Sequence, residues 1–250
     1  MLIRLLKLDI KFGYKKFLTM AGIMVVLGLL LPFLINLTGF LGLSGVLMLT
    51  LLITAISCIW LIIQHFYRNL FSNEGYLMFT LPVKPWQLLL SKTLTTLMWY
   101  NLFIIAAAVM ALFLNRDHSG IIESIKLAFS TEFFPIMVEM WVALNTIAIA
   151  MIMALYAGLT LSSVAVRGRS IGVIGGVVAT IALLFGYFTL QNKVTNMVQD
   201  HYFKDFDPTA SLTFMQQYGH LVAMAALTAV FGILLFMATQ YMMSKKLNLK

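Results

Sequence analysis

Charged residues are scarce in this sequence of 250 residues. They make up 10% of the chain, whereas hydrophobic residues make up 61%. A soluble globular domain carries roughly 25% charged residues, so the composition excludes an ordinary soluble protein and indicates a polytopic membrane protein. The formal net charge of +8 is spread over short segments between apolar runs. This distribution favours attraction to anionic lipid headgroups and argues against binding to nucleic acid.

Cysteine and the usual catalytic motifs are nearly absent as well. The only cysteine, Cys58, lies in an apolar run, which excludes an intramolecular disulfide. No Gly-x-x-x-x-Gly-Lys-Ser/Thr segment occurs, so the chain lacks a P-loop for ATP. The four histidines are scattered, no paired metal-ligand spacing occurs, and Gly-x-Ser-x-Gly is missing. We therefore expect no catalytic residues, metal site or cofactor in this chain, which counts against an intramembrane enzyme.

Six apolar runs are long enough to cross the hydrocarbon region of a bilayer, which takes about 20 helical residues. They cover approximately residues 17–37, 45–64, 94–114, 133–163, 171–190 and 219–243. Residues 1–250 are therefore predicted to form a single all-α transmembrane domain with six spans. The fourth run is longer than a span needs and is expected to tilt, bend or protrude.

Residues 2–17 precede the first span and have the pattern of an amphipathic helix. On a helical wheel the basic residues fall on one line: Arg4, Lys7, Lys11 and Lys15. The apolar residues gather on the other side: Leu2, Ile3, Leu6, Ile10 and Phe17. Such a helix is expected to lie in the plane of the lipid headgroups at the inner surface of the membrane. Alternatively, the segment is only a basic flank of the first span.

The basic residues predict the orientation of the chain. With the N-terminus inside, the cytoplasmic segments hold thirteen of the 17 Lys and Arg residues: Arg4, Lys7, Lys11, Lys15, Lys16, Arg68, Lys84, Lys92, Arg167, Arg169, Lys245, Lys246 and Lys250. The outer loops keep Arg116, Lys126, Lys193 and Lys204. This positive-inside bias places both termini in the cytoplasm.

Small residues recur at four-residue steps in two of the spans. The fourth span carries Thr146, Ala150, Ala154, Gly158 and Ser162, and the fifth carries Gly172-x-x-x-Gly176. Small residues allow helix backbones to approach closely. The pattern favours packing within the chain, and a dimer seam is the alternative.

Two polar residues within the fourth span, and two outer loops, have open roles. Placing Glu139 and Asn145 inside a membrane costs free energy. One interpretation places them on the wall of a substrate path, and the other has Glu139 reaching water and Asn145 bridging helices. The role of loop 115–132 is not indicated, whereas loop 191–218 mixes apolar and acidic residues and fits either an amphipathic or re-entrant cap or a plain solvated loop.

The segment between the second and third spans, residues 65–92, is the longest one predicted to face the cytoplasm. Its end reads NEGYLMFTLPVKPWQLLLSK. This stretch resembles the Glu-Gly-Tyr, Thr-Leu-Pro-Val and Leu-Leu-Leu-Ser-Lys run of bacterial permease subunits of type-2 ABC exporters, also called the type V fold. Six spans, an N-terminal amphipathic helix and cytoplasmic termini are similar to that family over the whole chain.

The resemblance implies a permease in the bacterial inner membrane that exports an amphiphilic substrate such as a peptide, lipid, glycan or drug. It implies a coupling helix that docks on a separate ATP-binding cassette subunit, formed by Asn73, Glu74, Gly75, Tyr76, Met78 and Phe79. ATP and Mg²⁺ would be bound by that ATPase. A second permease, identical or paralogous, would complete the path. The alternative is a six-span protein that works without ATP, such as a peptide-immunity or lipid-interacting protein.

Overall fold

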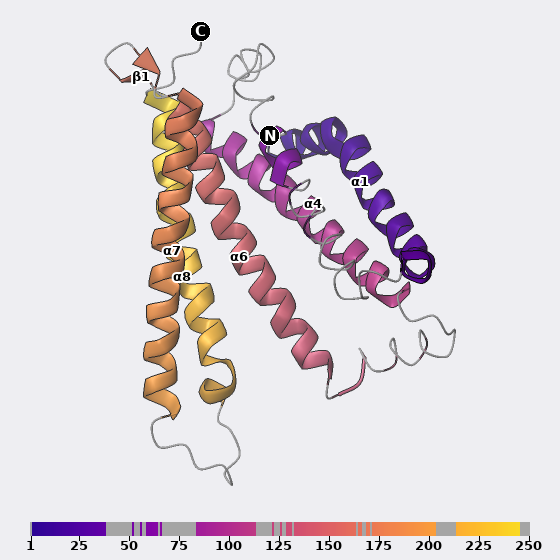
Figure 1. Ribbon diagram of the computed structural model, residues 1–250. Helices are drawn as coiled ribbons and strands as arrows, with labels where there is room; N and C mark the ends of the chain where they lie inside the picture. Colours follow the sequence, from indigo (N-terminus) through magenta and orange to yellow (C-terminus); the bar gives the residue numbers. More distant parts are fainter. Residues whose placement is uncertain are drawn as a thin grey trace. The chain divides into compact units, whose positions relative to one another are not determined.

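A computed structural model describes residues 2–38, 52, 56, 59–64, 66, 84–113, 122, 126, 129–131, 133–163, 165–166, 169–170, 172–203 and 214–245. Within these residues the fold is all-α apart from one very short pair of strands. The long helices are α1 (Leu2–Thr38), α4 (Pro85–Phe113), α6 (Phe133–Ser162), α7 (Gly172–Phe203) and α8 (Phe214–Lys245), drawn in Figure 1. Between α6 and α7, β1 (Ala165–Val166) pairs antiparallel with β2 (Arg169–Ser170) and reverses the chain.

Four helices of the described part are long and apolar enough to cross a membrane, as expected of an integral membrane protein. They are Pro85–Val109, Phe133–Ser162, Ile174–His201 and Tyr218–Ser244. These helices confirm the spans predicted third to sixth as apolar helices of sufficient length. The first predicted span, 17–37, lies within α1, and most of the second, 45–64, lies outside the described residues.

The helix boundaries differ most from the predicted spans in two places, whereas α8 begins only five residues before its predicted start at 219. At the first, α7 continues to Phe203, so residues 191–203 extend the helix where the sequence predicted the start of an outer loop. No Gly or Pro interrupts the chain between Gly186 and Pro208, so the polar residues there are accommodated in a helix. At the second, α4 begins at Pro85, several residues before the predicted start at 94.

The N-terminal amphipathic segment and the predicted first span form one continuous helix, α1. Figure 1 shows that α1 bends between a stretch next to the N-terminus and a second, longer stretch. Continuity is permitted because no helix-breaking residue separates the two parts: Gly13 is tolerated within the helix, and the first proline is Pro32.

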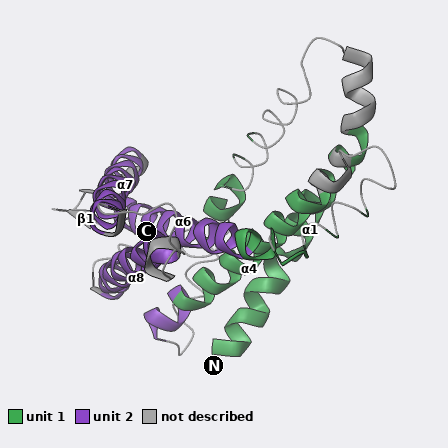
Figure 2. Ribbon diagram, turned by 90° about the horizontal axis from the view of Figure 1, so that it is seen from below, with its two compact units in different colours: residues 1–83, 90–137 green, residues 84–89, 138–250 purple. Residues whose placement is uncertain are grey.

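The chain divides into two compact units, coloured separately in Figure 2. One comprises Met1–Val83 and Leu90–Met137, and contains α1 and most of α4. The other comprises Lys84–Leu89 and Val138–Lys250, and contains most of α6 together with α7 and α8.

In the second unit, α6 and α7 approach each other through glycine. A Cβ atom added to Gly158 would lie 2.7 Å from the carbonyl oxygen of Gly176 and would collide with the hydroxyl of Thr180. A Cβ atom added to Gly176 would lie 2.6 Å from the carbonyl oxygen of Gly158. The whole small stripe of α6 is buried: Thr146, Ala150, Ala154, Gly158 and Ser162. The predicted packing of this stripe within the chain is therefore confirmed.

The α7–α8 pair of the second unit is joined by a buried hydrogen bond. The hydroxyl oxygens of Tyr187 and Thr228 are 2.7 Å apart, and the Thr228 hydroxyl donates to the carbonyl of Met224 at 2.7 Å. Because a threonine has one hydroxyl proton, Tyr187 is the donor to Thr228. Beside this bond, an apolar core joins all three helices of the unit: Met153, Ala154, Ala157 and Leu235, with Leu183, Leu184 and Phe231 packed against them.

Candidate functional site

The six residues of the predicted coupling helix, Asn73, Glu74, Gly75, Tyr76, Met78 and Phe79, lie outside the described residues. The description resumes at Lys84, where the same segment leads into α4. The carbonyl of Lys84 accepts hydrogen bonds from the backbone N–H groups of Gln87 (2.9 Å) and Leu88 (3.4 Å). Pro85 therefore occupies the first turn of α4, where its missing N–H leaves no hydrogen bond unmade. Pro85 is thus the first residue of α4, the helix that contains the third predicted span.

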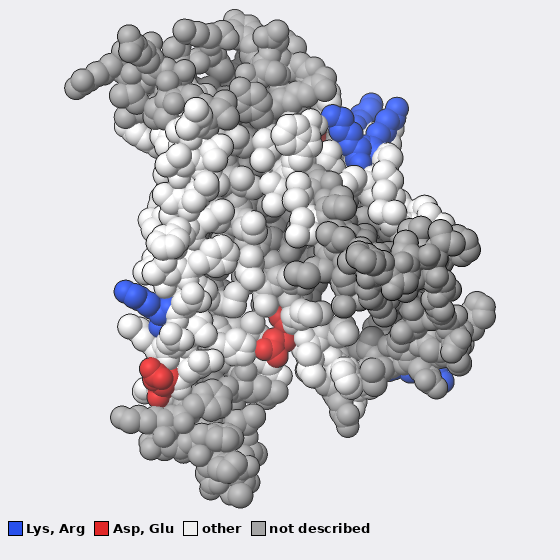
Figure 3. Space-filling view, viewed as in Figure 1, with Lys and Arg blue, Asp and Glu red and all other residues white. Residues whose placement is uncertain are grey.

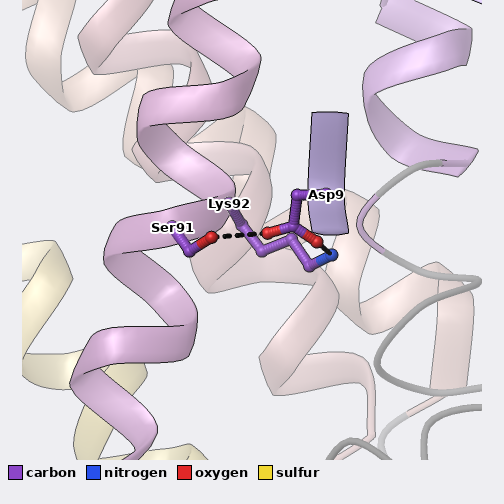
Figure 4. Close-up of polar contacts among 3 residues, drawn as sticks. All are labelled: Asp9, Ser91 and Lys92. Carbon is purple, nitrogen blue, oxygen red and sulfur yellow. Dashed lines mark hydrogen bonds and ion pairs between the residues drawn. The ribbon is translucent and has the colours of Figure 1, made fainter. Parts of the chain in front are cut away.

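About two turns into α4, a buried polar cluster connects this helix to α1. The Lys92 ammonium forms an ion pair with carboxylate oxygen Oδ1 of Asp9. The Ser91 hydroxyl donates to the other oxygen, Oδ2, at 2.6 Å. Figure 4 shows both α4 side chains directed at the single carboxylate. The side chains of Lys92 and Asp9 are 0% and 3% exposed, so the pair is almost entirely removed from solvent.

Asp9 lies on the face of α1 that is opposite to its basic residues. The positions one helical turn away, where a neighbouring side chain could reach the carboxylate, hold Leu5, Leu6, Phe12 and Gly13. None of them is basic, so α1 cannot neutralise its only acid by itself. A buried carboxylate requires a cation and hydrogen-bond donors, and α4 supplies both.

Aromatic side chains continue the α1–α4 contact beyond the ion pair. The Phe17 ring stacks on Trp99, with centroids 5.0 Å apart and planes 6° apart. The centroid of the Phe17 ring also lies 6.0 Å from the centroid of the Phe103 ring. Asp9 and then Phe17 on α1 meet Ser91 and then Trp99 on α4, so the contacts advance in the same direction along both helices. The two helices therefore run parallel.

In the part of the chain that the structure describes, two polar groups of α4 are buried without a hydrogen bond. They are the hydroxyl of Thr95 and the indole N–H of Trp99, which lack a hydrogen bond among the residues that the structure describes. The two residues are one turn apart and so share a face of α4. An unpaired buried polar group destabilises a folded protein, so this part of the interface is less stable than a fully paired one.

The two residues assigned to a substrate path have different surroundings in the second unit. The Glu139 carboxylate on α6 lies 3.0 Å from Nε2 of His220 on α8, and both side chains are about one third exposed. The Asn145 amide donates to the backbone carbonyl of Trp141, one turn earlier in α6, at 2.9 Å. The described contacts do not join Glu139 to Asn145, and the substrate path stays a prediction.

In the sequence, Lys92 is one of the thirteen basic residues predicted to face the cytoplasm and ends the Leu-Leu-Leu-Ser-Lys run, and Asp9 is the single acid of residues 2–17. The structure makes them the most buried charged residues of the described part. One signal of this role is present in the sequence, because Asp9 interrupts the apolar face of an otherwise regular amphipathic helix. The choice of Lys92 as its partner depends on tertiary structure.

Within the described residues, no group of three or more His, Cys, Asp or Glu side chains is placed to hold a metal ion. Comparison with known proteins finds no match among protein-family models, curated proteins or solved structures.

Proposed function

We propose that this chain is the permease subunit of an ATP-driven exporter of the type-2 ABC class. It crosses the bacterial inner membrane six times with both termini in the cytoplasm. Separate ATPase subunits bind ATP and Mg²⁺, and a second permease, identical or paralogous, forms the other wall of the path. The cargo is amphiphilic: a peptide, a lipid, a glycan or a drug.

The proposal is carried by the stretch from Asn73 to Lys92 and its connection to α4. The resemblance to the ABC permeases ends in Leu-Leu-Leu-Ser-Lys, and the last two of these residues are Ser91 and Lys92. Both bind the Asp9 carboxylate of α1. The stretch assigned to the ATPase contact is therefore continuous with a helix that is attached to the N-terminal helix by a buried ion pair.

The directions of the helices support the six-span arrangement. Because α1 and α4 are parallel, the chain between them must return across the membrane if both helices cross it, and the predicted second span at 45–64 supplies that return. In the second unit, Gly158 and Ser162 of α6 face Thr180 and Gly176 of α7 in reverse order, so these helices are antiparallel. The β1–β2 turn connects them on one side of the membrane.

In the proposed mechanism, ATP binding closes the two ATPase subunits on each other and displaces the coupling helix that is docked on them. This movement is transmitted to α4 at its first residue, Pro85. The Asp9–Lys92 pair passes it to α1, because separating the two helices would leave opposite charges unpaired in a dry environment. The path between the two permeases then changes its access from the inner to the outer side.

Purification of the full chain under mild conditions tests the proposal. We expect an affinity-tagged chain, extracted from its native membrane into nanodiscs, to carry two ATPase subunits and a second permease, with ATP hydrolysis that depends on Mg²⁺. A monomeric particle without an ATPase, at concentrations at which such complexes survive, would support the ATP-independent alternative.

A further inference from the structure

The first turns of α1 present a basic face that the ion pair leaves free. Arg4, Lys7, Lys11 and Lys15 follow one another at steps of three or four residues, and all four are exposed. Residues at these steps lie on the same side of a helix. Figure 3 shows the basic side chains gathered over the N-terminal part of α1.

Apolar side chains border this basic face on both sides. Ile3 is 80% exposed and Phe12 is 61% exposed, and Leu8 and Tyr14 are also exposed. A basic face bordered by exposed apolar and aromatic side chains is the pattern of a segment at the level of the lipid headgroups. Its apolar groups enter the boundary between headgroups and acyl chains, and its cations remain at the level of the phosphates.

The opposite face of α1 fixes the direction in which the basic residues point. Leu5, Asp9 and Phe17 are buried there, and the ion pair with Lys92 holds the helix against rotation about its axis. This pairing also removes the only carboxylate of α1 from the surface. The charged side chains on the exposed face are therefore all cations, and they point away from α4.

We propose that this face, formed by Arg4, Lys7, Lys11 and Lys15 with Ile3, Leu8, Phe12 and Tyr14, is a fixed docking surface for anionic phospholipid headgroups. Charge complementarity and the apolar border together identify the occupant. A nucleic acid would satisfy the cations but would leave Ile3 and Phe12 in water. The proposal does not depend on the ATPase and holds for the chain alone.

The test measures lipid preference directly on the full chain in nanodiscs. Cys58→Ser removes the native cysteine, and Tyr14→Cys introduces a fluorophore site at the edge of the basic face. Quenching is then compared for nitroxide-labelled phosphatidylglycerol and nitroxide-labelled phosphatidylcholine. Since each surface cation contributes a factor of about five to binding of an anionic membrane, we expect phosphatidylglycerol to be preferred at least tenfold. High salt should reduce the preference.

A quadruple variant, Arg4→Gln, Lys7→Gln, Lys11→Gln and Lys15→Gln, should lose this preference. Because all four side chains are exposed, we expect it to fold, and the single variants Lys7→Gln and Lys11→Gln give a graded loss if it does not. The control changes exposed lysines elsewhere, Lys84→Gln, Lys126→Gln and Lys193→Gln, and should keep the preference. Equal quenching by the two lipids, or an undiminished preference in the quadruple variant, would overturn the proposal.

Discussion

Asp9 of α1 and Lys92 of α4 form an ion pair from which solvent is almost completely excluded, and Ser91 donates a hydrogen bond to the same carboxylate. The pair joins two parts of the chain that are far apart in sequence. One part carries the basic face at the N-terminus, and the other begins where the segment resembling an ABC coupling helix ends. In the proposed mechanism, this pair connects the ATPase contact to the membrane surface.

Breaking the pair on one side should be strongly destabilising. Asp9→Asn or Lys92→Met leaves one buried group without its partner, and the expected loss in the free energy of unfolding is about 3–5 kcal/mol. Replacing both residues, Asp9→Leu with Lys92→Met, removes both charges and should recover most of that loss. Chemical unfolding of the purified chain in mild detergent measures each value. Removal of an exposed charge, Lys11→Ala, is the control, and strictly additive effects of the two single substitutions would contradict the pairing.

The hydroxyl of Thr95, which has no hydrogen bond to any described residue, predicts a stabilising substitution. Thr95→Val keeps the shape of the side chain and removes a buried group without a hydrogen bond, so stability should rise by roughly 1 kcal/mol. Thr160→Val is the matched control, because that equally buried hydroxyl donates to the carbonyl of Tyr156 at 2.7 Å. The control should not be stabilised. A loss of stability in Thr95→Val would show that its hydroxyl is paired in the membrane.

The close approach of α6 and α7 makes two glycines irreplaceable. Gly158→Ala and Gly176→Ala each place a methyl group against backbone atoms of the other helix, so the helices must separate. Overpacking of this kind typically costs about 1–3 kcal/mol. Gly186→Ala, on α7 itself, meets nothing within 4 Å and should be neutral or slightly stabilising. Thermal unfolding in nanodiscs distinguishes them, and equal midpoints for Gly158→Ala and Gly186→Ala would contradict the packing.

The distribution of basic residues predicts the topology. A reporter that works only in the cytoplasm should be active when it is fused after Lys250, and a reporter that works only outside should be active when it is inserted near Asp205. Activity of the same reporter at both positions would exclude six spans. The parallel arrangement of α1 and α4 agrees with this topology. Two parallel spans must be separated by an odd number of crossings, and the predicted second span is one crossing.

Much of the fold follows from the sequence because long apolar runs dictate helices. The runs from 133 to 163 and from 219 to 243 match α6 and α8 closely, and the small stripe around Gly158 correctly indicated helix contact within the chain. The helix ends were harder to predict. Residues 191–203 are polar enough to suggest a loop, but nothing in them breaks a helix, so α7 continues.

Only one of the two charged residues in the polar cluster could be recognised from the sequence. Asp9 stands out as an acid on the apolar face of an amphipathic helix, which predicts a buried partner without naming it. Lys92 looks like a typical cation at the inner end of a span, and nothing local to its sequence indicates burial. Lys92 becomes the partner of Asp9 because α1 packs parallel to α4. That arrangement depends on contacts between distant residues such as Phe17 and Trp99.

The coupling stretch provides the most direct test of the proposed ABC permease function. Tyr76→Ala combined with Phe79→Ala removes two aromatic anchors from the predicted ATPase contact, each worth about 1–3 kcal/mol. Glu74→Lys converts an attractive contact with a basic partner into a repulsive one. The measurement is the amount of ATPase that co-purifies with each variant, and the rate of ATP hydrolysis in the complex, beside the outer-loop control Lys126→Ala. We predict that the double variant and Glu74→Lys insert normally but co-purify with at least tenfold less ATPase. The control should co-purify with the normal amount. Retention of the complete complex and of full hydrolysis by the double variant would contradict the proposed function.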